Sequence, residues 1–172
     1  MRCAARGMVH IAGSASVAVT MLLAACLMPG AAQAATTTTT FQVTATVLST
    51  CQVSATGLAF GNYTGAQTNA TSTISVTCTN TTPYNVGLDA GTSAGATVTT
   101  RAMTGPAGAL LGYALYSDAA RSVNWGNTVG TDTVTGTGTG SAQALMVYGR
   151  IPAGSLPTPG AYADTVTVTV TY

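Results

Sequence analysis

The chain ends in the segment ADTVTVTVTY, residues 163–172, in which threonine alternates with valine. Successive side chains of an extended strand point to opposite faces, so Val166, Val168, Val170 and Tyr172 share one face and the threonines share the other. The segment therefore predicts a β-strand with one apolar face. It contains no lysine, proline or glycine that would hinder pairing, so it also predicts an open sheet edge that needs a partner.

The first 34 residues are typical of a secretory signal peptide. Arg2 and Arg6 precede a mostly apolar run from Ile11 to Met28, and a small-residue cleavage site follows that ends at Ala34. Glycine, serine and threonine interrupt the apolar run and argue against a transmembrane anchor. The alternative is a lipoprotein signal, because the sequence LAAC ends at Cys26.

Cleavage after Ala34 leaves 172 − 34 = 138 residues, which is the size of one domain. This part contains three arginines, four aspartates and no lysine, glutamate or histidine, so its net charge is 3 − 4 = −1. Such a balance offers no basic surface for nucleic acid. Without histidine or lysine, no Ser–His or Ser–Lys catalytic pair can form. We therefore predict a protein that is not an enzyme and needs no cofactor, metal or small-molecule substrate.

Two cysteines follow the signal peptide, Cys51 and Cys78. In an exported chain they predict a disulfide, although two free buried thiols are the alternative. The bond would close a loop of 78 − 51 = 27 residues. Zinc binding is excluded, because two thiols without histidine cannot fill four ligand positions.

Short apolar runs separated by turn residues predict seven or eight strands and no helix of useful length. The expected ranges are 41–53, 58–63, 72–78, 83–88, 96–103, 110–117, 143–151 and 162–172. The glycine-rich stretch 135–142 lacks the lysine and the helix of a phosphate-binding loop, so it is expected to be a flexible loop. The pattern favours an all-β fold, an antiparallel β-sandwich.

In the segment 35–48, a run of five threonines follows Ala35 and alternating apolar residues come next. In an extended strand Phe41, Val43, Ala45 and Val47 would share one face. Two interpretations stay open at this point. The segment is either the first strand of its own sandwich or a strand that is added to the sheet edge of another molecule.

The sequence after the signal peptide resembles the spore coat protein U domain family, which includes the archaic (Csu-type) chaperone–usher pilins. The resemblance rests on the alternating strand that runs into Cys51 and on the ordered motifs LAFGNYTG (58–65), ISVTC (74–78), YALYSDAAR (113–121), VYGRIPAG (147–154) and GAYADTVTVTVTY (160–172). It implies an incomplete immunoglobulin-like β-sandwich over residues 49–172, which lacks its last strand and is completed by donor-strand exchange. Cys51–Cys78 would be the family disulfide.

The resemblance also implies partners and a location. A periplasmic pilus chaperone would first lend a strand beside the acceptor edge, which comprises Val166, Val168, Val170 and Tyr172. At the outer-membrane usher, the donor segment 35–48 of another copy or a sister subunit would then replace the chaperone strand, giving a head-to-tail polymer. The chain would be exported to the periplasm and then to the cell surface as a pilus subunit for adhesion or biofilm formation. The alternatives are a secreted spore or cell coat protein of the same family and a monomeric carbohydrate-binding module.

Overall fold

Eight β-strands and one short turn of 3-10 helix make up the regular structure of residues 33–172, the part of the chain that this computed structural model describes. The predicted signal peptide, apart from its last two residues, and the alternative lipidation site Cys26 lie outside the described residues. The elements are β1 (Cys51–Ala55), β2 (Thr68–Cys78), β3 (Pro83–Leu88), β4 (Arg101–Thr104), η1 (Pro106–Gly108), β5 (Leu110–Tyr116), β6 (Val134–Thr137), β7 (Gln143–Ile151) and β8 (Val168–Thr171). The all-β prediction is confirmed.

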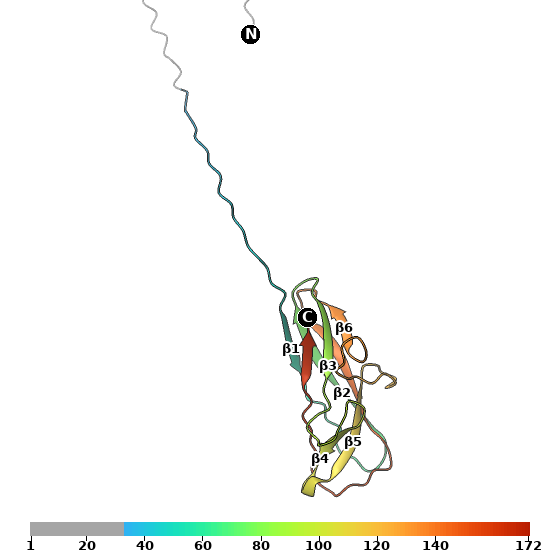
Figure 1. The fold of residues 1–172 in the computed structure, drawn as a ribbon. Coiled ribbons are helices and arrows are strands. Elements are labelled where there is room, and N and C mark those ends of the chain that lie inside the picture. Colours follow the sequence, from blue (N-terminus) through green and yellow to red (C-terminus); the bar gives the residue numbers. More distant parts are fainter. Residues whose placement is uncertain (1–32) are drawn as a thin grey trace, which may run out of the picture. The chain divides into compact units, whose positions relative to one another are not determined.

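The strands form two antiparallel sheets (Figure 1). One sheet has five strands in the order β1-β2-β7-β5-β4, and the other has three in the order β6-β3-β8. The apolar strand β7 lies in the centre of the larger sheet, between β2 and β5. Four strands, β1, β4, β6 and β8, therefore stand at sheet edges.

The core lies between the two sheets and is built by the alternate side chains of the longer strands. Its buried apolar members are Ile74, Val76, Cys78, Tyr84, Val86, Leu88, Leu111, Tyr113, Leu115, Trp125, Val147 and Ile151. Trp125 enters from a loop and donates its indole N–H to the carbonyl oxygen of Val86 at 2.8 Å. Burial of each large apolar side chain contributes about 1.5–3 kcal/mol to folding.

A buried arginine joins the loops beside this core. Arg101 is only 1% exposed, and its guanidinium donates to four main-chain carbonyl oxygens at 2.7–2.8 Å, those of Leu88, Asp89, Val98 and Trp125. A buried cation is tolerated only where its N–H groups find acceptors, and here carbonyl dipoles supply them. Arg101 therefore fixes the end of β3 against the loop that carries Trp125.

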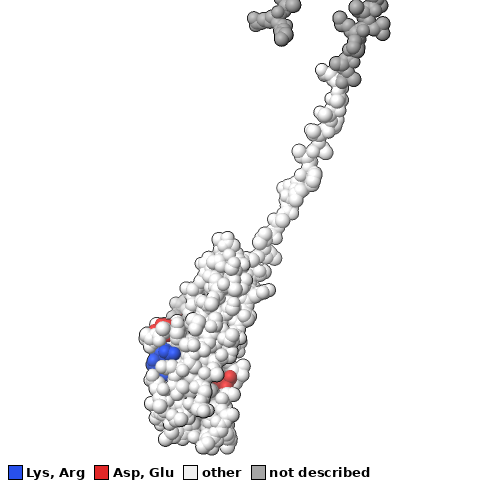
Figure 2. All heavy atoms as spheres, turned by 180° about the vertical axis from the view of Figure 1, so that it is seen from behind, with Lys and Arg blue, Asp and Glu red and all other residues white. Residues whose placement is uncertain are grey.

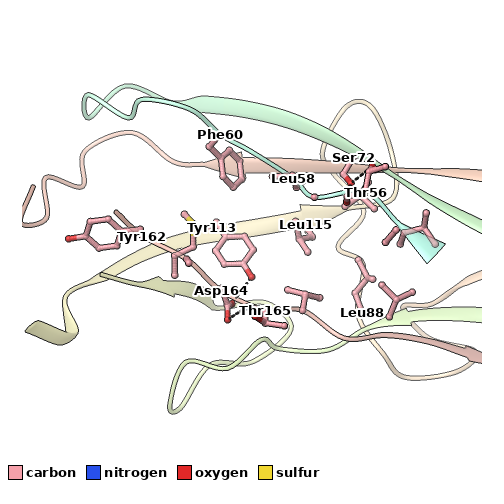
Figure 3. Close-up of a pocket in the computed structure, with 18 residues that line it drawn as sticks. Thr56, Leu58, Phe60, Ser72, Leu88, Tyr113, Leu115, Tyr162, Asp164 and Thr165 are labelled. Carbon is pink, nitrogen blue, oxygen red and sulfur yellow. Dashed lines mark hydrogen bonds between the residues drawn. The ribbon is translucent and has the colours of Figure 1, made fainter. Parts of the chain in front are cut away.

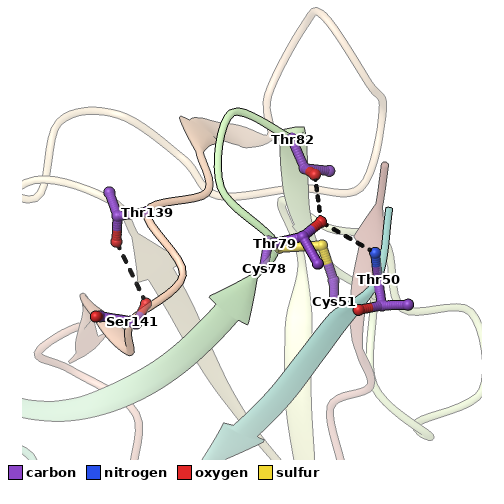
Figure 4. Close-up of a disulfide and its surroundings, with 7 residues drawn as sticks. All are labelled: Thr50, Cys51, Cys78, Thr79, Thr82, Thr139 and Ser141. Atoms are coloured by element: carbon purple, nitrogen blue, oxygen red, sulfur yellow. Dashed lines mark hydrogen bonds between the residues drawn. A yellow bond between two sulfur atoms is a disulfide. The ribbon is translucent and has the colours of Figure 1, made fainter. Parts of the chain in front are cut away.

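The predicted disulfide is present and joins Cys51 to Cys78 (Figure 4). The two cysteines are direct cross-strand partners, at the first residue of β1 and the last residue of β2. Beside them the N–H of Thr50 donates to the hydroxyl of Thr79 at 3.2 Å, and that hydroxyl lies 2.6 Å from the hydroxyl of Thr82. The bridge ties the short edge strand β1 to the longest strand of the sheet.

The glycine-rich stretch 135–142 was expected to be a flexible loop, and this expectation is wrong for its first residues. Val134–Thr137 form β6, which pairs with β3. A side chain at Gly136 would lie 2.4 Å from the ring of Tyr84, so the glycine lets β6 approach the buried tyrosine. Its glycine content reflects close packing within a sheet.

Further expected strands are shorter than the sequence predicts or are missing. The expected strand 41–53 is regular only from Cys51, the first residue of β1, because residues 33–50 form no strand. Residues 58–63 form no strand. In the expected strand 96–103, Thr97 and Thr100 form a hydroxyl-bonded turn, and β4 begins only at Arg101. Threonine favours strands, but its hydroxyl also bonds to nearby backbone N–H groups and so supports turns.

Replacement of Arg101 by methionine is expected to lower the free energy of unfolding by about 3–5 kcal/mol, because it leaves two buried and two partly buried carbonyl groups without their donor. Arg150→Met removes a half-buried arginine and serves as the matched control, with an expected loss below about 1 kcal/mol. Denaturant unfolding of both variants measures the difference. Equal losses would contradict the role given to Arg101.

Reduction of the disulfide is expected to lower the free energy of unfolding by about 3–4 kcal/mol, because the unfolded chain regains the freedom of a 27-residue loop. Thermal unfolding with and without reductant measures the effect. The double variant Cys51→Ser/Cys78→Ser should match the reduced protein. A melting temperature that does not respond to reductant would show that the bond contributes little.

Candidate strand-accepting groove

The C-terminal strand β8 forms one edge of the three-stranded sheet. It pairs with β3 from Leu88↔Val168 to Asn85↔Thr171, and its other side has no strand partner among residues 33–172. The predicted alternation is visible in the burial of the segment. Val166, Val168 and Val170 pack half-buried against the core, whereas Tyr172 is 58% exposed.

The strand predicted over residues 162–172 is regular only at its end. Ala163 forms an isolated bridge with Thr104, and β8 begins at Val168. The expectation of one continuous strand is therefore wrong for residues 164–167. Residues 164–167 pair with no strand of the described chain, and they are held mainly by side-chain carboxylates and by one main-chain hydrogen bond from Asp89 to Thr167.

The opposite edge belongs to β1 and the residues that follow it. Val53 of β1 is the cross-strand partner of Val76 and points to the same face of the sheet, yet it is 41% exposed whereas Val76 is 0% exposed. The difference arises because β1 stands at the margin of the core, next to β8 (Figure 1). An inward-facing valine thus remains open to solvent at the seam between the two sheets.

A groove of about 420 Å³ runs between these two edges (Figure 3). Leu58 and Phe60 form one wall, and residues 162–166 together with Val168 form the other. The floor is the core itself, with Tyr113 and Leu115 at its centre. Phe60 meets Tyr113 edge to face, with ring centroids 6.2 Å apart.

Small and hydroxyl residues shape the wall on the β1 side. A side chain at Gly149 would lie 2.9 Å from Leu58 and Phe60, so the glycine lets both side chains lie against β7. Further along the wall, the buried Ser72 donates its hydroxyl to the carbonyl oxygen of Thr56. The N–H of Thr73 donates to the Thr56 hydroxyl at 3.0 Å.

Asp164 anchors the wall on the β8 side. Its carboxylate accepts hydrogen bonds from the N–H and the hydroxyl of Thr92, both at 2.8 Å, and from the hydroxyl of Tyr113 at 2.7 Å. Burial tends to raise the pKa of Asp164, but these hydrogen bonds outweigh it and the pKa lies below its usual value. Burial and the adjacent carboxylate raise the pKa of Tyr113, so its hydroxyl remains a donor.

Asp89 holds the same wall one step closer to β8. Its carboxylate accepts the N–H groups of Thr167 at 2.8 Å and Gly91 at 3.0 Å, and its own N–H donates to the Thr167 carbonyl oxygen at 3.1 Å. Burial tends to raise the pKa of Asp89, but the hydrogen bonds and the nearby charge of Arg101 lower it overall. Hydrogen bonds to these two carboxylates therefore hold residues 164–167 in place, as hydrogen bonds to a neighbouring strand hold the strands of a sheet.

The predicted donor residues lie in a part of the chain without regular structure. Residues 33–50 contain no helix or strand, and Phe41, Val43 and Val47 are 86%, 81% and 88% exposed. Ala45 is exposed as well. Within the described residues the segment thus forms no strand of this sandwich.

Several groove residues were not singled out from the sequence. Leu58 and Phe60 alternate in the motif LAFGNY, which was interpreted only as a short strand. Asp89 and Asp164 stand in sequences typical of turns, and nothing near them indicates that they hold the C-terminal segment. Their partners, such as Thr92 for Asp164, are distant in sequence.

The groove offers apolar side chains, free backbone edges and carboxylates that already have partners. Residues 33–172 include no group of three or more His, Cys, Asp or Glu side chains that could hold a metal ion. No helix in the same part of the chain is long and apolar enough to cross a membrane. The arrangement suits the binding of an extended peptide, because such a peptide satisfies backbone groups and inserts alternate side chains.

Two sequence comparisons match most of the chain. The sequence profile of the Spore Coat Protein U domain matches residues 37–169. Protein U of Myxococcus xanthus is 35% identical over 158 residues, a match that covers 82% of this chain and 88% of that protein.

The fold is also similar to a solved structure, that of the CsuC–CsuE chaperone–tip adhesion subunit pre-assembly complex from archaic chaperone-usher Csu pili of Acinetobacter baumannii. The TM-score is 0.56 and the sequence identity is 27%, over 74% of this chain. The match spans 40% of the length of the chain in that complex.

The two carboxylates predict an acid-sensitive wall. Their lowered pKa values mean that they stabilise the folded state fully above about pH 4, the usual range of aspartate, and lose this contribution as the pH falls through their folded-state values. Asp164→Asn is expected to lower the free energy of unfolding by about 1 kcal/mol at pH 7. The double variant Asp89→Asn/Asp164→Asn should show a flatter pH dependence between about pH 5 and pH 2. A pH profile identical to that of the wild type would contradict this role.

Proposed function

The chain belongs to the Spore Coat Protein U domain family, and from this premise we propose that it is a structural subunit of a surface pilus assembled by the chaperone–usher pathway through donor-strand complementation. The function it serves is adhesion or biofilm formation. The observation that carries the proposal is the groove between β1 and β8, where an apolar floor lies between two sheet edges that are each paired on one side only. An added strand would satisfy both edges and cover the floor.

The acceptor edge in this proposal comprises Val166, Val168, Val170 and Tyr172. The geometry favours the first two as contacts of the donor, because Val166 and Val168 line the groove. Val170 packs half-buried beside them, and Tyr172 offers its exposed ring to a partner.

The donor in this proposal is the segment 35–48 of another copy or of a sister subunit. Its residues Phe41, Val43, Ala45 and Val47 would enter the groove, and each large apolar side chain that becomes buried contributes about 1.5–3 kcal/mol. The exposure of this segment supports the proposal, because it leaves these side chains available. A contact between a groove on one molecule and a segment of the next is head to tail and extends into a filament.

Before assembly, a periplasmic chaperone would cover the groove, and the outer-membrane usher would exchange its strand for the donor segment. The solved relative supports the chaperone, since its structure is a complex of a subunit with a chaperone. Residues 1–34 would be the signal peptide that exports the chain to the periplasm, before it reaches the cell surface. In this role the protein is not an enzyme and uses no cofactor.

A peptide-complementation experiment tests the proposal with matched pairs of substitutions. A truncated protein of residues 49–172, which lacks both the predicted signal peptide and the donor segment, is refolded under oxidising conditions. A synthetic peptide of residues 35–48 is then added. We expect the truncated protein to be a weakly stable monomer whose melting temperature the peptide raises. The Val43→Asp peptide should fail because it places a charge in the groove, whereas the Thr44→Asp peptide should act like the wild type. On the acceptor side, Val168→Asp should block the peptide and Thr169→Asp should not.

Each outcome bears on the proposal. Head-to-tail chains of the untruncated protein, which disappear on deletion of residues 35–48, would support it. A truncated protein that is fully stable alone and ignores the peptide would overturn it and favour a complete monomeric sandwich. Electron microscopy of cells that make the protein then distinguishes a filament from the coat layer of the alternative function.

A further inference from the structure

Two tyrosines and two arginines form a patch on the outer face of the five-stranded sheet. Tyr116 of β5 and Tyr148 of β7 are cross-strand partners, and both point away from the core because their neighbours Leu115 and Val147 point into it. The guanidinium of Arg150 lies over the Tyr116 ring at 5.6 Å, and that of Arg121 lies over the Tyr148 ring at 5.7 Å. We call these four residues the Arg–Tyr patch.

The patch holds the accessible positive charge of the described chain. Of the arginines in residues 33–172, Arg101 is buried, and the other two belong to the patch. Figure 2 shows the blue atoms gathered in one place, with red atoms of acidic residues beside them and a second red group on the other side of the same face. An anion bound beside both guanidiniums would offset the repulsion between the two cations.

The partners of both guanidiniums leave N–H groups free for such an anion. Arg121 donates to the carbonyl oxygens of Gly149 at 3.1 Å and Ala119 at 3.2 Å, and Arg150 makes a long contact of 3.4 Å with the amide oxygen of Asn69. No carboxylate is among these partners. Asp118 lies in the same loop as Arg121, but its carboxylate accepts the N–H and hydroxyl of Ser122 and the N–H of Val123.

A hollow of about 410 Å³ adjoins the patch. Arg150 and Tyr116 line it on one side and Thr99 and Thr100 on another, and the small residues Gly112 and Ala114 leave room above the sheet. This volume lies within the usual range of small-ligand pockets. The site therefore combines fixed guanidiniums, an aromatic ring and hydroxyl groups around a space open to solvent.

We propose that the Arg–Tyr patch and the adjoining hollow bind an acidic polysaccharide, a chain of uronic acid residues. A guanidinium fork matches a carboxylate with two parallel hydrogen bonds, and stacking on tyrosine holds the fork in place. The threonine hydroxyls supply partners for the hydroxyl groups of a sugar in the hollow. Because a uronic acid chain carries a carboxylate on each sugar, one chain would also neutralise both arginines at once.

The charge balance argues against nucleic acid as the ligand. Binding to DNA depends on many phosphate contacts, but residues 33–172 carry three arginines and four aspartates. The patch offers only two cations, which suits a ligand bound through a few short-range contacts. None of its residues belongs to β1 or β8, so the patch is independent of the groove and of the proposed assembly.

The test measures binding of oligogalacturonate to the exported, disulfide-bonded protein by titration calorimetry. The probes for comparison are the fully methyl-esterified oligosaccharide, which has the same sugars without charge, and a short DNA duplex. We expect oligogalacturonate to bind, added salt to weaken it, and the methyl ester to bind at least about ten-fold more weakly.

Substitutions locate the site. Arg150→Gln and the double variant Arg121→Gln/Arg150→Gln should weaken binding by about ten-fold or more, and Arg150→Lys should restore it only in part because lysine lacks the fork. Ser75→Ala changes the same face of the sheet at a distance from the patch, and should leave binding unchanged. Unfolding curves check that each variant is folded. If the double variant does not fold, the binding measured for Arg150→Gln alone decides the test.

Three results would overturn the proposal. These are absence of oligogalacturonate binding to the wild type, equal binding by the folded Arg150→Gln variant, and preference for the DNA duplex. Self-association that depends on both arginines and needs no saccharide would assign the patch to contacts between copies of the chain instead.

Discussion

Backbone groups along the seam between β1 and β8 need hydrogen-bond partners, but the chain supplies few of them there. Most features of this structure follow from that shortage. A buried or half-buried strand edge without partners is costly, because each lost hydrogen bond leaves a polar group exposed to an apolar surrounding. The chain pairs β8 with β3 and β1 with β2, and each of them keeps one free side. The groove between them is the space that one more strand would fill.

Polar side chains maintain the walls of this groove in the absence of that strand. Asp89 and Asp164 bind the N–H groups of Thr167 and Thr92, and Arg101 fixes the carbonyl group of Asp89 itself. These contacts keep the C-terminal segment extended without occupying its outward backbone groups. The segment is thereby prepared for pairing, so less ordering entropy remains to oppose the arrival of a strand.

The sequence predicted the elements whose side chains alternate against a continuous core. The regular pattern of residues 72–78, 83–88 and 143–151 follows from the two-residue period of a buried strand, and the structure confirms these strands. It also indicated a sheet edge at residues 163–172, because they alternate cleanly and contain no lysine, proline or glycine.

The features of the fold and of the groove that were not predicted depend on contacts between residues far apart in the chain. Residues 58–63 have the composition of a strand but lack a neighbour to pair with, so they line the groove as irregular chain. β6 was missed because the close contact of Gly136 with Tyr84 joins two distant segments. The carboxylate contacts of Asp164 were hidden for the same reason, since a lone aspartate indicates only a turn.

The position of the disulfide has a mechanical consequence for a filament built in the proposed way. Tension between two subunits would enter each subunit through the residues just before Cys51, at the start of a five-residue edge strand. Without a crosslink, the load would act on the few hydrogen bonds that hold β1 to β2. The covalent bond to Cys78 instead carries the force directly into β2, an eleven-residue strand that is itself paired with β7. The hydrogen bonds of this short edge strand are thus bypassed, and the strength of the fibre would be set by the inserted strand and by the central sheet.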